Sequence, residues 1–140
     1  MNLSKNVKIT QVLVATTTGT TTINTSVVDM QGYDGVVFLV STGSAAADIG
    51  VKLQQGQVSD GSDASDLAGS KQLSDATQKA FVLDLYQPQE RYVRAAIQRT
   101  TTTTIEAAWA IQYCGAKMPI NNVTAAQAAK LLASPDEGTA

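Results

Sequence analysis

The sequence predicts an all-β protein, a jelly-roll or Greek-key β-sandwich of seven to eight strands with a short C-terminal helix. Three observations support this fold class. Apolar and polar residues alternate in several segments, turn-forming residues separate these segments, and one capping-box pattern stands near the end of the chain. We therefore expect an N-terminal arm over residues 1–6, a sandwich domain over 7–118, and a helix with a polar tail over 119–140.

The first strands follow from the positions of the apolar residues. Residues 7–14 and the Thr-rich stretch 20–30 supply two or three strands. Residues 36–40 are continuously apolar between turn-forming neighbours, which is typical of a central strand buried on both faces. Residues 49–54 and 81–85 alternate in polarity, so each is expected to be a strand with one face in water.

The last two expected strands have the clearest period of two. In one of them the inward set is Val93, Ala95 and Ile97. In the other, the expected inward set is Ile105, Ala107, Trp109, Ile111 and Tyr113. Trp109 is accordingly expected to pack in the core rather than to serve as a ligand platform. The threonines between the two segments favour a hairpin, which would make the strands adjacent and antiparallel.

Two segments depart from the strand pattern. Residues 56–74 are rich in Gly, Ser and Asp and are expected to form a long exposed loop. Thr124 and Gln127 match a capping box, which predicts that a helix begins there and ends near Ser134-Pro135. A helix of about ten residues is marginal alone, so it is expected to dock on its own sandwich or on a neighbour.

Composition limits the classes of function. The 140 residues are 44 % hydrophobic and 16 % charged, which does not suit a disordered chain, and no apolar run is long enough to span a bilayer. The net charge of -2 argues against nucleic acid and membrane surfaces as partners. Residues 1–6 do not resemble a secretory signal peptide, which favours the cytoplasm as the site of synthesis.

Few residues could carry chemistry. The chain has no histidine and a single cysteine, Cys114, which excludes most hydrolase and metalloenzyme templates and predicts neither catalysis nor a cofactor. Cys114 is expected to be a buried or half-buried filler, because no histidine is present to activate it. Asp60, Asp63 and Asp66 could offer oxygen ligands to calcium, but their spacing differs from that of an EF-hand. A solvated loop without a metal is therefore the expected state of this segment.

Three arginines lie on or beside one expected strand. Arg91, Arg94 and Arg99, with Tyr92, could contact a nucleic acid, form a protein interface, or serve as structural and ion-pairing residues. The structural interpretation is favoured, because Arg91 and Arg99 fall at the strand ends and the total charge is acidic.

A resemblance to a known family rests on two stretches, VVDMQGYDGVVFLV at residues 27–40 and VLDLYQPQERYVR at residues 82–94. With the loop between them, they resemble the jelly-roll cement (decoration) proteins on the capsids of tailed bacteriophages. The similarity covers roughly residues 27–118. It implies a non-enzymatic virion protein on the capsid exterior, often a homodimer, that binds the major capsid protein and braces the joints between capsomers.

The same sequence features are compatible with other functions. One is a phage head-to-tail connector or tail component of similar size, which the sequence does not separate from a shell protein. Copy number per virion would separate the two. A ligand- or carbohydrate-binding sandwich would use the loop at residues 56–74. The resemblance supplies no contact motif, so the partner-contact candidates come from the apolar residues near the two ends, namely Leu3, Val7, Leu131 and Leu132. These residues either anchor the chain to a neighbouring subunit or shell, or close its own sandwich.

Overall fold

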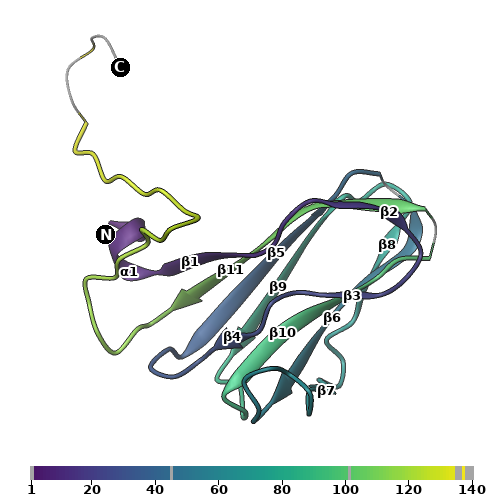
Figure 1. Ribbon diagram of the computed structural model, residues 1–140, viewed down its shortest axis with the longest axis horizontal. Helices are drawn as coiled ribbons and strands as arrows, with labels where there is room; N and C mark the ends of the chain where they lie inside the picture. The colour runs from purple at the N-terminus through teal and green to yellow at the C-terminus, as the bar shows by residue number, and fades with distance from the viewer. Residues whose placement is uncertain (1, 45, 101, 135–136, 138–140) are drawn as a thin grey trace.

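The computed structural model describes residues 2–44, 46–100, 102–134 and 137. Two antiparallel sheets face each other to form a sandwich, and the C-terminal segment leaves the body beside the N-terminus (Figure 1). The expectation of an all-β sandwich is therefore confirmed. The strands are more numerous than the seven to eight expected, because several two-residue pairings flank the long strands.

Sheet A has the order β1-β11-β5-β9, and β2 also pairs with β11. Its strands are β1 (Lys8–Leu13), β2 (Thr16–Gly19), β5 (Gly35–Thr42), β9 (Ala80–Tyr86) and β11 (Thr103–Tyr113). The expected strands at residues 7–14, 36–40, 81–85 and 105–113 all lie in this sheet.

Sheet B has the order β3-β10-β6-β7, with β4 also paired to β10 and β8 to β6. Its strands are β3 (Ile23–Asn24), β4 (Val28–Asp29), β6 (Ala47–Gly56), β7 (Ser65–Asp66), β8 (Gln72–Asp75) and β10 (Tyr92–Gln98). The segment 56–74 thus contains β7 and the start of β8 rather than an uninterrupted loop.

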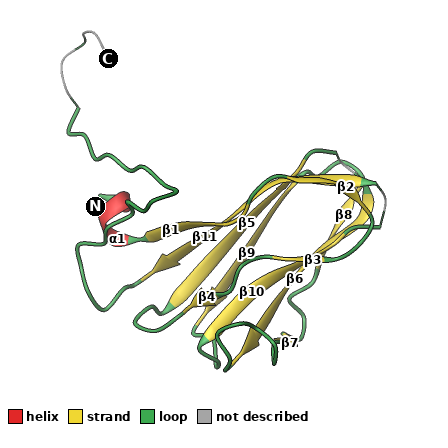
Figure 2. Cartoon of the chain, in the orientation of Figure 1, coloured by secondary structure: helices red, strands yellow, loops and turns green. Residues whose placement is uncertain are grey.

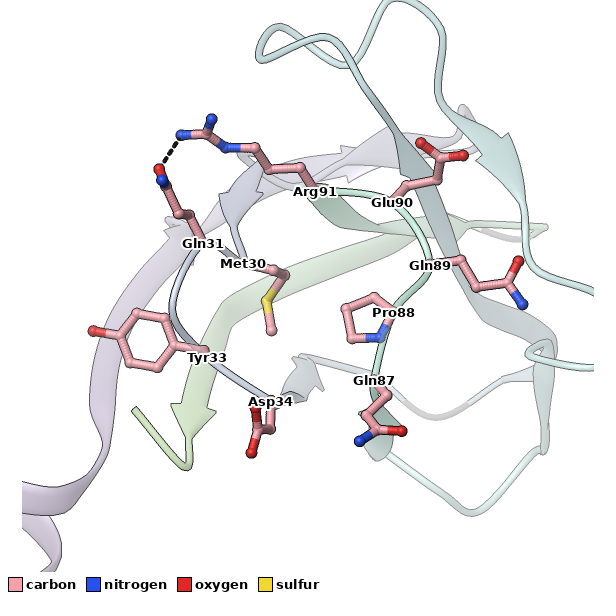
Figure 3. A pocket seen from close by; sticks show the side chains of 9 residues that line it. All are labelled: Met30, Gln31, Tyr33, Asp34, Gln87, Pro88, Gln89, Glu90 and Arg91. Carbon is pink, nitrogen blue, oxygen red and sulfur yellow. Dashed lines mark hydrogen bonds between the residues drawn. The ribbon is translucent and has the colours of Figure 1, made fainter. Parts of the chain in front are cut away.

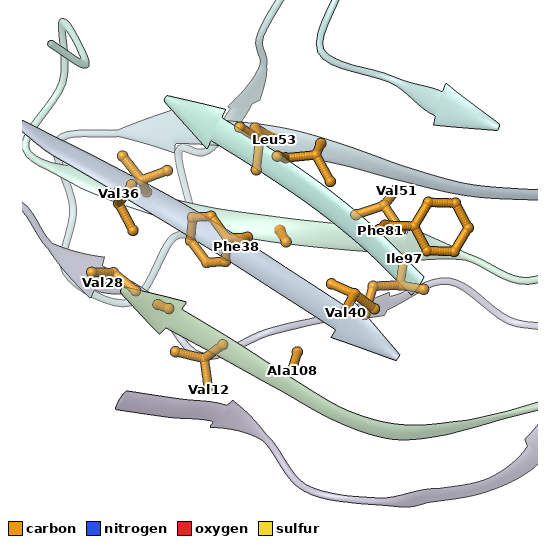
Figure 4. Packing of buried hydrophobic residues seen from close by; sticks show 14 of the residues in the cluster. Val12, Val28, Val36, Phe38, Val40, Val51, Leu53, Phe81, Ile97 and Ala108 are labelled. Atoms are coloured by element: carbon orange, nitrogen blue, oxygen red, sulfur yellow. The ribbon is translucent and has the colours of Figure 1, made fainter. Parts of the chain in front are cut away.

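The core lies between the two sheets (Figure 4). Phe38 of β5 faces inward from sheet A, and Ile49 and Ile97 are fully buried on sheet B. Val93, Ala95 and Ile97 all face inward, as expected from their alternation. Each large apolar side chain buried here contributes roughly 1.5–3 kcal/mol to the stability of the sandwich.

The expectation that the last two strands form a hairpin is wrong. β10 pairs with β3, β4 and β6 in sheet B, whereas β11 pairs with β1, β2 and β5 in sheet A. The threonine-rich connection therefore crosses from one sheet to the other. Alternating polarity shows which face of a strand is buried, but it does not distinguish a hydrogen-bonded neighbour from a strand in the facing sheet.

The helix expected after residue 119 is also wrong for the residues that the structure describes. The described helix is α1 (Leu3–Asn6), which lies in the expected N-terminal arm (Figure 2). Thr124 and Gln127 close a turn instead, with backbone bonds of 2.9 Å and 3.3 Å between their N–H and C=O groups. The Gln127 side chain donates to the backbone oxygens of Ile9 and Asn122, each at 2.9 Å, rather than to the Thr124 amide. Tertiary hydrogen bonds therefore replace the capping box.

No helix in the described part of the chain has the length and apolar character needed to cross a membrane.

Candidate functional site

A β-bulge in β11 decides which side chains face the solvent side of sheet A. Ile105 is opposite Thr42 of β5, but Ala107 is opposite Ser41, so Glu106 is an additional residue in β11. A shift of one residue moves every following side chain to the other face of the sheet. Ile105 is buried ahead of the bulge, and the buried residues beyond it are Ala108, Ala110 and Gln112.

The bulge corrects the expectation for Trp109 and its alternate neighbours. Trp109, Ile111 and Tyr113 are half-buried and do not belong to the core cluster, whereas Ala108 and Ala110 do. They lie on the outside of sheet A. The expectation of a β5 buried on both faces is corrected too, because Val37 and Leu39 alternate outward and are only half-buried.

The strand registers bring these outward residues together. Ile111 lies between Ile9 and Val37, and Trp109 lies between Gln11 and Leu39. Val82 of β9 is opposite Leu39 and is 58 % exposed. We call this set of six apolar residues the outer face: Ile9, Val37, Leu39, Val82, Trp109 and Ile111. Val82 is exposed and the other five are half-buried, so together they form a contiguous apolar surface that is partly open to solvent. Apolar surface gathered in one place in this way is typical of an interaction site.

Polar contacts border the outer face. The Tyr113 hydroxyl donates a 2.7 Å hydrogen bond to Oδ1 of Asp84 on β9, two strands away. Gly35, on the strand between them, leaves the space for the tyrosine ring, because a Cβ at this position would lie 2.2 Å from the ring. Partial burial, and then the bond to the Asp84 carboxylate, raise the pKa of Tyr113 to about 12. Tyr113 is therefore a neutral donor at neutral pH and holds the side chain of Asp84 in place.

Asn122 joins the C-terminal segment to the N-terminal segment. Its side chain is buried, donates to the carbonyls of Ser4 and Val7 at 2.9 Å and 3.0 Å, and accepts from the Ile9 amide at 2.8 Å. With the bonds of Gln127, these contacts hold residues 122–127 along β1. The sequence gives no sign of this role, because a buried Asn has no periodic pattern.

The four partner-contact candidates lie in different environments. Val7 is buried within the chain, so its side chain does not reach the surface. Leu3 is exposed on α1, and Leu131 and Leu132 are 46 % and 59 % exposed in the segment that follows the Gln127 anchor. The structure therefore leaves Leu3, Leu131 and Leu132 accessible to a partner, and it does not bring the four residues together.

The three aspartates weighed as calcium ligands each have protein partners of their own. Asp63 accepts from the amides of Gln57 and Val58, and Asp60 accepts from the Ser62 amide at 2.8 Å. Hydrogen bonds from Lys52 and Gln54 lower the pKa of Asp66. No cluster of three acidic, cysteine or histidine residues suited to a metal occurs in the described residues.

The arginines do not form one cluster either. Arg91 lines a groove of about 420 Å³ beside Tyr33 and Pro88 (Figure 3). Asp29 binds Arg91 in a bidentate pair at 2.8 Å and 2.9 Å, and this guanidinium lowers the pKa of Asp29. Arg94 donates to Gln54, while Arg99 is buried and donates to backbone carbonyls. Their contacts are those of structural and ion-pairing residues.

Cys114 differs from its expected environment. It is exposed rather than buried or half-buried, and it has a positive φ of 52° directly after β11. The end of the strand, rather than core packing, determines its position.

Comparisons with protein-family models, curated proteins and solved structures found no match to this chain.

Proposed function

We propose that this chain is a non-enzymatic structural protein of a tailed-phage virion, a cement or decoration protein on the outside of the capsid. It binds the major capsid protein and stabilises the joints between capsomers. The observation that carries the proposal is the outer face, a rigid apolar surface on the outside of a sandwich. The resemblance in residues 27–40 and 82–94 supplies the class of partner.

The outer face has the chemistry of a protein-docking surface. Trp109 lies near its centre. Leu39 is opposite Trp109 on β5, and Ile111 is two residues further along β11. Tryptophan is enriched among the residues that contribute most to protein interfaces, particularly where smaller apolar contacts surround it. β-Sheet backbone holds these side chains in place before binding, so little ordering is required on association.

The order of the strands supports a jelly roll as the finer fold class. β1, β11, β5 and β9 form one sheet, and β10, β6 and β8 follow one another across the other, next to β3 and β4. The first strand, β1, lies beside the last, β11, and the chain passes between the sheets from β5 to β6, from β9 to β10 and from β10 to β11. This arrangement fits the two Greek keys of a jelly roll. The same fold is implied by the resemblance.

Binding to empty shells tests the outer face. Purified chain is mixed with capsid shells that lack it, and the bound fraction is measured by sedimentation. Trp109→Ala is expected to weaken binding at least about 30-fold, which corresponds to a hot-spot loss of about 2 kcal/mol. Ile111→Ser should weaken binding in the same direction. Leu73→Ser is the matched control, because Leu73 is an exposed apolar residue of β8 in the other sheet.

Two results would overturn the proposal. One is failure of the unmodified chain to bind any shell of its own phage. The other is equal binding by Trp109→Ala, Ile111→Ser and Leu73→Ser. Counting copies in purified particles separates a cement protein, present over the whole lattice, from a connector confined to one vertex or a component confined to the tail.

A further inference from the structure

β9 leaves one edge of sheet A open. Thr42 donates its N–H to the carbonyl of Lys79, and Gln87 donates to that of Asp34, at the two ends of the β5–β9 ladder. The register between them has no shift, so residues 81, 83 and 85 bond to β5 in the same way. The N–H and C=O groups of the alternate residues, Ala80, Val82, Asp84 and Tyr86, therefore point away from the sheet. No strand in the described chain pairs with this edge.

This edge has little of the usual protection against pairing, since its one charged residue is Asp84. Proteins commonly protect an edge strand with charged side chains, especially lysine, or with a proline, a bulge or a very short length. β9 has seven residues, AFVLDLY, with a regular register and neither proline nor lysine. It therefore presents an intact template for one more strand.

A groove of about 410 Å³ runs beside the open edge. Leu83 and Leu85 of β9 line one wall, and the opposite wall comes from sheet B and the segment after β7, with Leu53, Leu67, Ala68, Gly69 and Ser70. An added strand would therefore meet apolar side chains on its inward face. On its outward face it would meet Val82 and Asp84.

We propose that residues 128–134 of a second copy of this chain bind the open edge of β9 as an antiparallel strand. This segment, AAKLLAS, is exposed, contains no helix, and extends away from the body (Figure 1). One register matches its side chains to the edge. Lys130 lies opposite Asp84, Leu132 lies opposite Val82, and Leu131 enters the groove opposite Leu83.

The register is specific because neighbouring registers are worse. A shift by one residue would turn Lys130 into the apolar groove, and a shift by two would place Leu132 against the Asp84 carboxylate. In the matched register the residues facing the open groups of β9 are 128, 130, 132 and 134, which are the positions that can complete the hydrogen-bond ladder.

The segment cannot reach the edge of its own chain. The Gln127 side chain donates to the Ile9 carbonyl and Asn122 accepts from the Ile9 amide, so both backbone groups of Ile9 point away from β11 and Gln127 lies on the far side of β1 from β9. Ile9 lies at the same level as Asp84 through Ile111 and Val37. A strand added beyond β9 stands four strand spacings from β1, about 19 Å. Three residues from Gln127 to Lys130 span at most about 11 Å. A second copy must therefore supply the strand. The inference requires only self-association, so its failure leaves the proposed binding to a shell untouched.

Disulfide trapping tests the register. In a Cys114→Ser background, chain with Asp84→Cys is mixed with chain carrying Lys130→Cys and oxidised. Residues directly opposite each other on antiparallel strands have Cα atoms about 5.5 Å apart, within the range that a disulfide bridges. A linked dimer is expected in this mixture and not in the out-of-register mixture of Tyr86→Cys with Lys130→Cys. Equal linkage in the two mixtures, or none in the first, would overturn the register.

Solution association tests the contact without cysteines. Sedimentation of the full chain is expected to show self-association, and Lys130→Glu should weaken it about fivefold to tenfold by placing like charges opposite Asp84. Combining Lys130→Glu with Asp84→Lys should restore it. Lys117→Glu, at another exposed lysine, makes the same charge change and should have no effect.

Two further variants separate the contact from folding. A chain ending after Gln127 should lose association with no change in its unfolding midpoint, because residues 128–134 are exposed. Val82→Pro should also block association while keeping the ladder to β5, because the Val82 amide points to the open edge. A full chain that stays monomeric at high micromolar concentration, or a truncated chain that associates as well as the full one, would overturn the proposal.

Discussion

Replacing Arg99 with methionine is expected to destabilise the sandwich by about 2–4 kcal/mol. Arg99 is only 6 % exposed and follows β10. It donates to the carbonyls of Thr21, Thr17 and Thr103 at 2.9, 3.0 and 3.1 Å, and to the Thr21 hydroxyl at 3.1 Å. Each bond from a charged donor contributes about 1.5–3 kcal/mol, but removal of the guanidinium also relieves several kcal/mol of desolvation.

Urea denaturation followed by Trp109 fluorescence provides the assay. With a denaturant slope of about 2 kcal/mol per molar, the midpoint should fall by about 1–2 M. Arg91→Met is the matched control, because Arg91 and Asp29 form a pair whose side chains are 44 % and 45 % exposed. Such a pair contributes about 1 kcal/mol or less. Arg99 follows β10 of sheet B, and its partners lie in or beside β2 and β11 of sheet A. Equal small shifts for the two variants would refute the view that these bonds stabilise the contact between the two sheets.

Phe38→Ala should lower the free energy of unfolding by about 3–5 kcal/mol, measured by the same denaturation, because it opens a cavity between the sheets. Absorbance titration should show one of the four tyrosines ionising near pH 12, and Asp84→Asn should lower that value. Because folding raises the pKa of Tyr113, its contribution to stability is present below about pH 10 and is lost as pH rises toward 12. Added calcium or a chelator should leave the melting temperature unchanged, and a calcium-dependent rise would contradict this expectation. Asp63→Ala should lower the melting temperature, because the amides of Gln57 and Val58 would lose their acceptor.

The period of two in the sequence predicted the buried face of a strand correctly where every second residue is apolar and the residues between them are mostly polar. β10 is such a case, and Val93 and Ile97 face inward as expected. β11 is not, because Ala108 and Ala110 compete with Trp109 and Ile111 for the inward face. The bulge at Glu106 decides between the two sets, and it depends on pairing with β5 that no local pattern contains.

The candidate site was less accessible to prediction than the fold. The apolar run at residues 36–40 indicated burial on both faces, but Val37 and Leu39 face outward and are only half-buried. In β5 and β11, both the inward and the outward residues are apolar. Two such strands side by side could have indicated that the outer side of the sheet is an apolar surface. The C-terminal turn was hidden for another reason, because the Gln127 side chain bonds a strand 118 positions earlier in the sequence.

The bulge at Glu106 also indicates how relatives of this chain should be aligned. If a relative lacked this one residue, positions 109 and 111 would face Phe38 and its neighbours, and the space between the sheets would not admit a tryptophan and an isoleucine there. A gap at position 106 should therefore coincide with small residues at 109 and 111 and larger ones at 108 and 110. Alignments that penalise single-residue gaps inside strands would pair the wrong faces of β11 and miss such relatives.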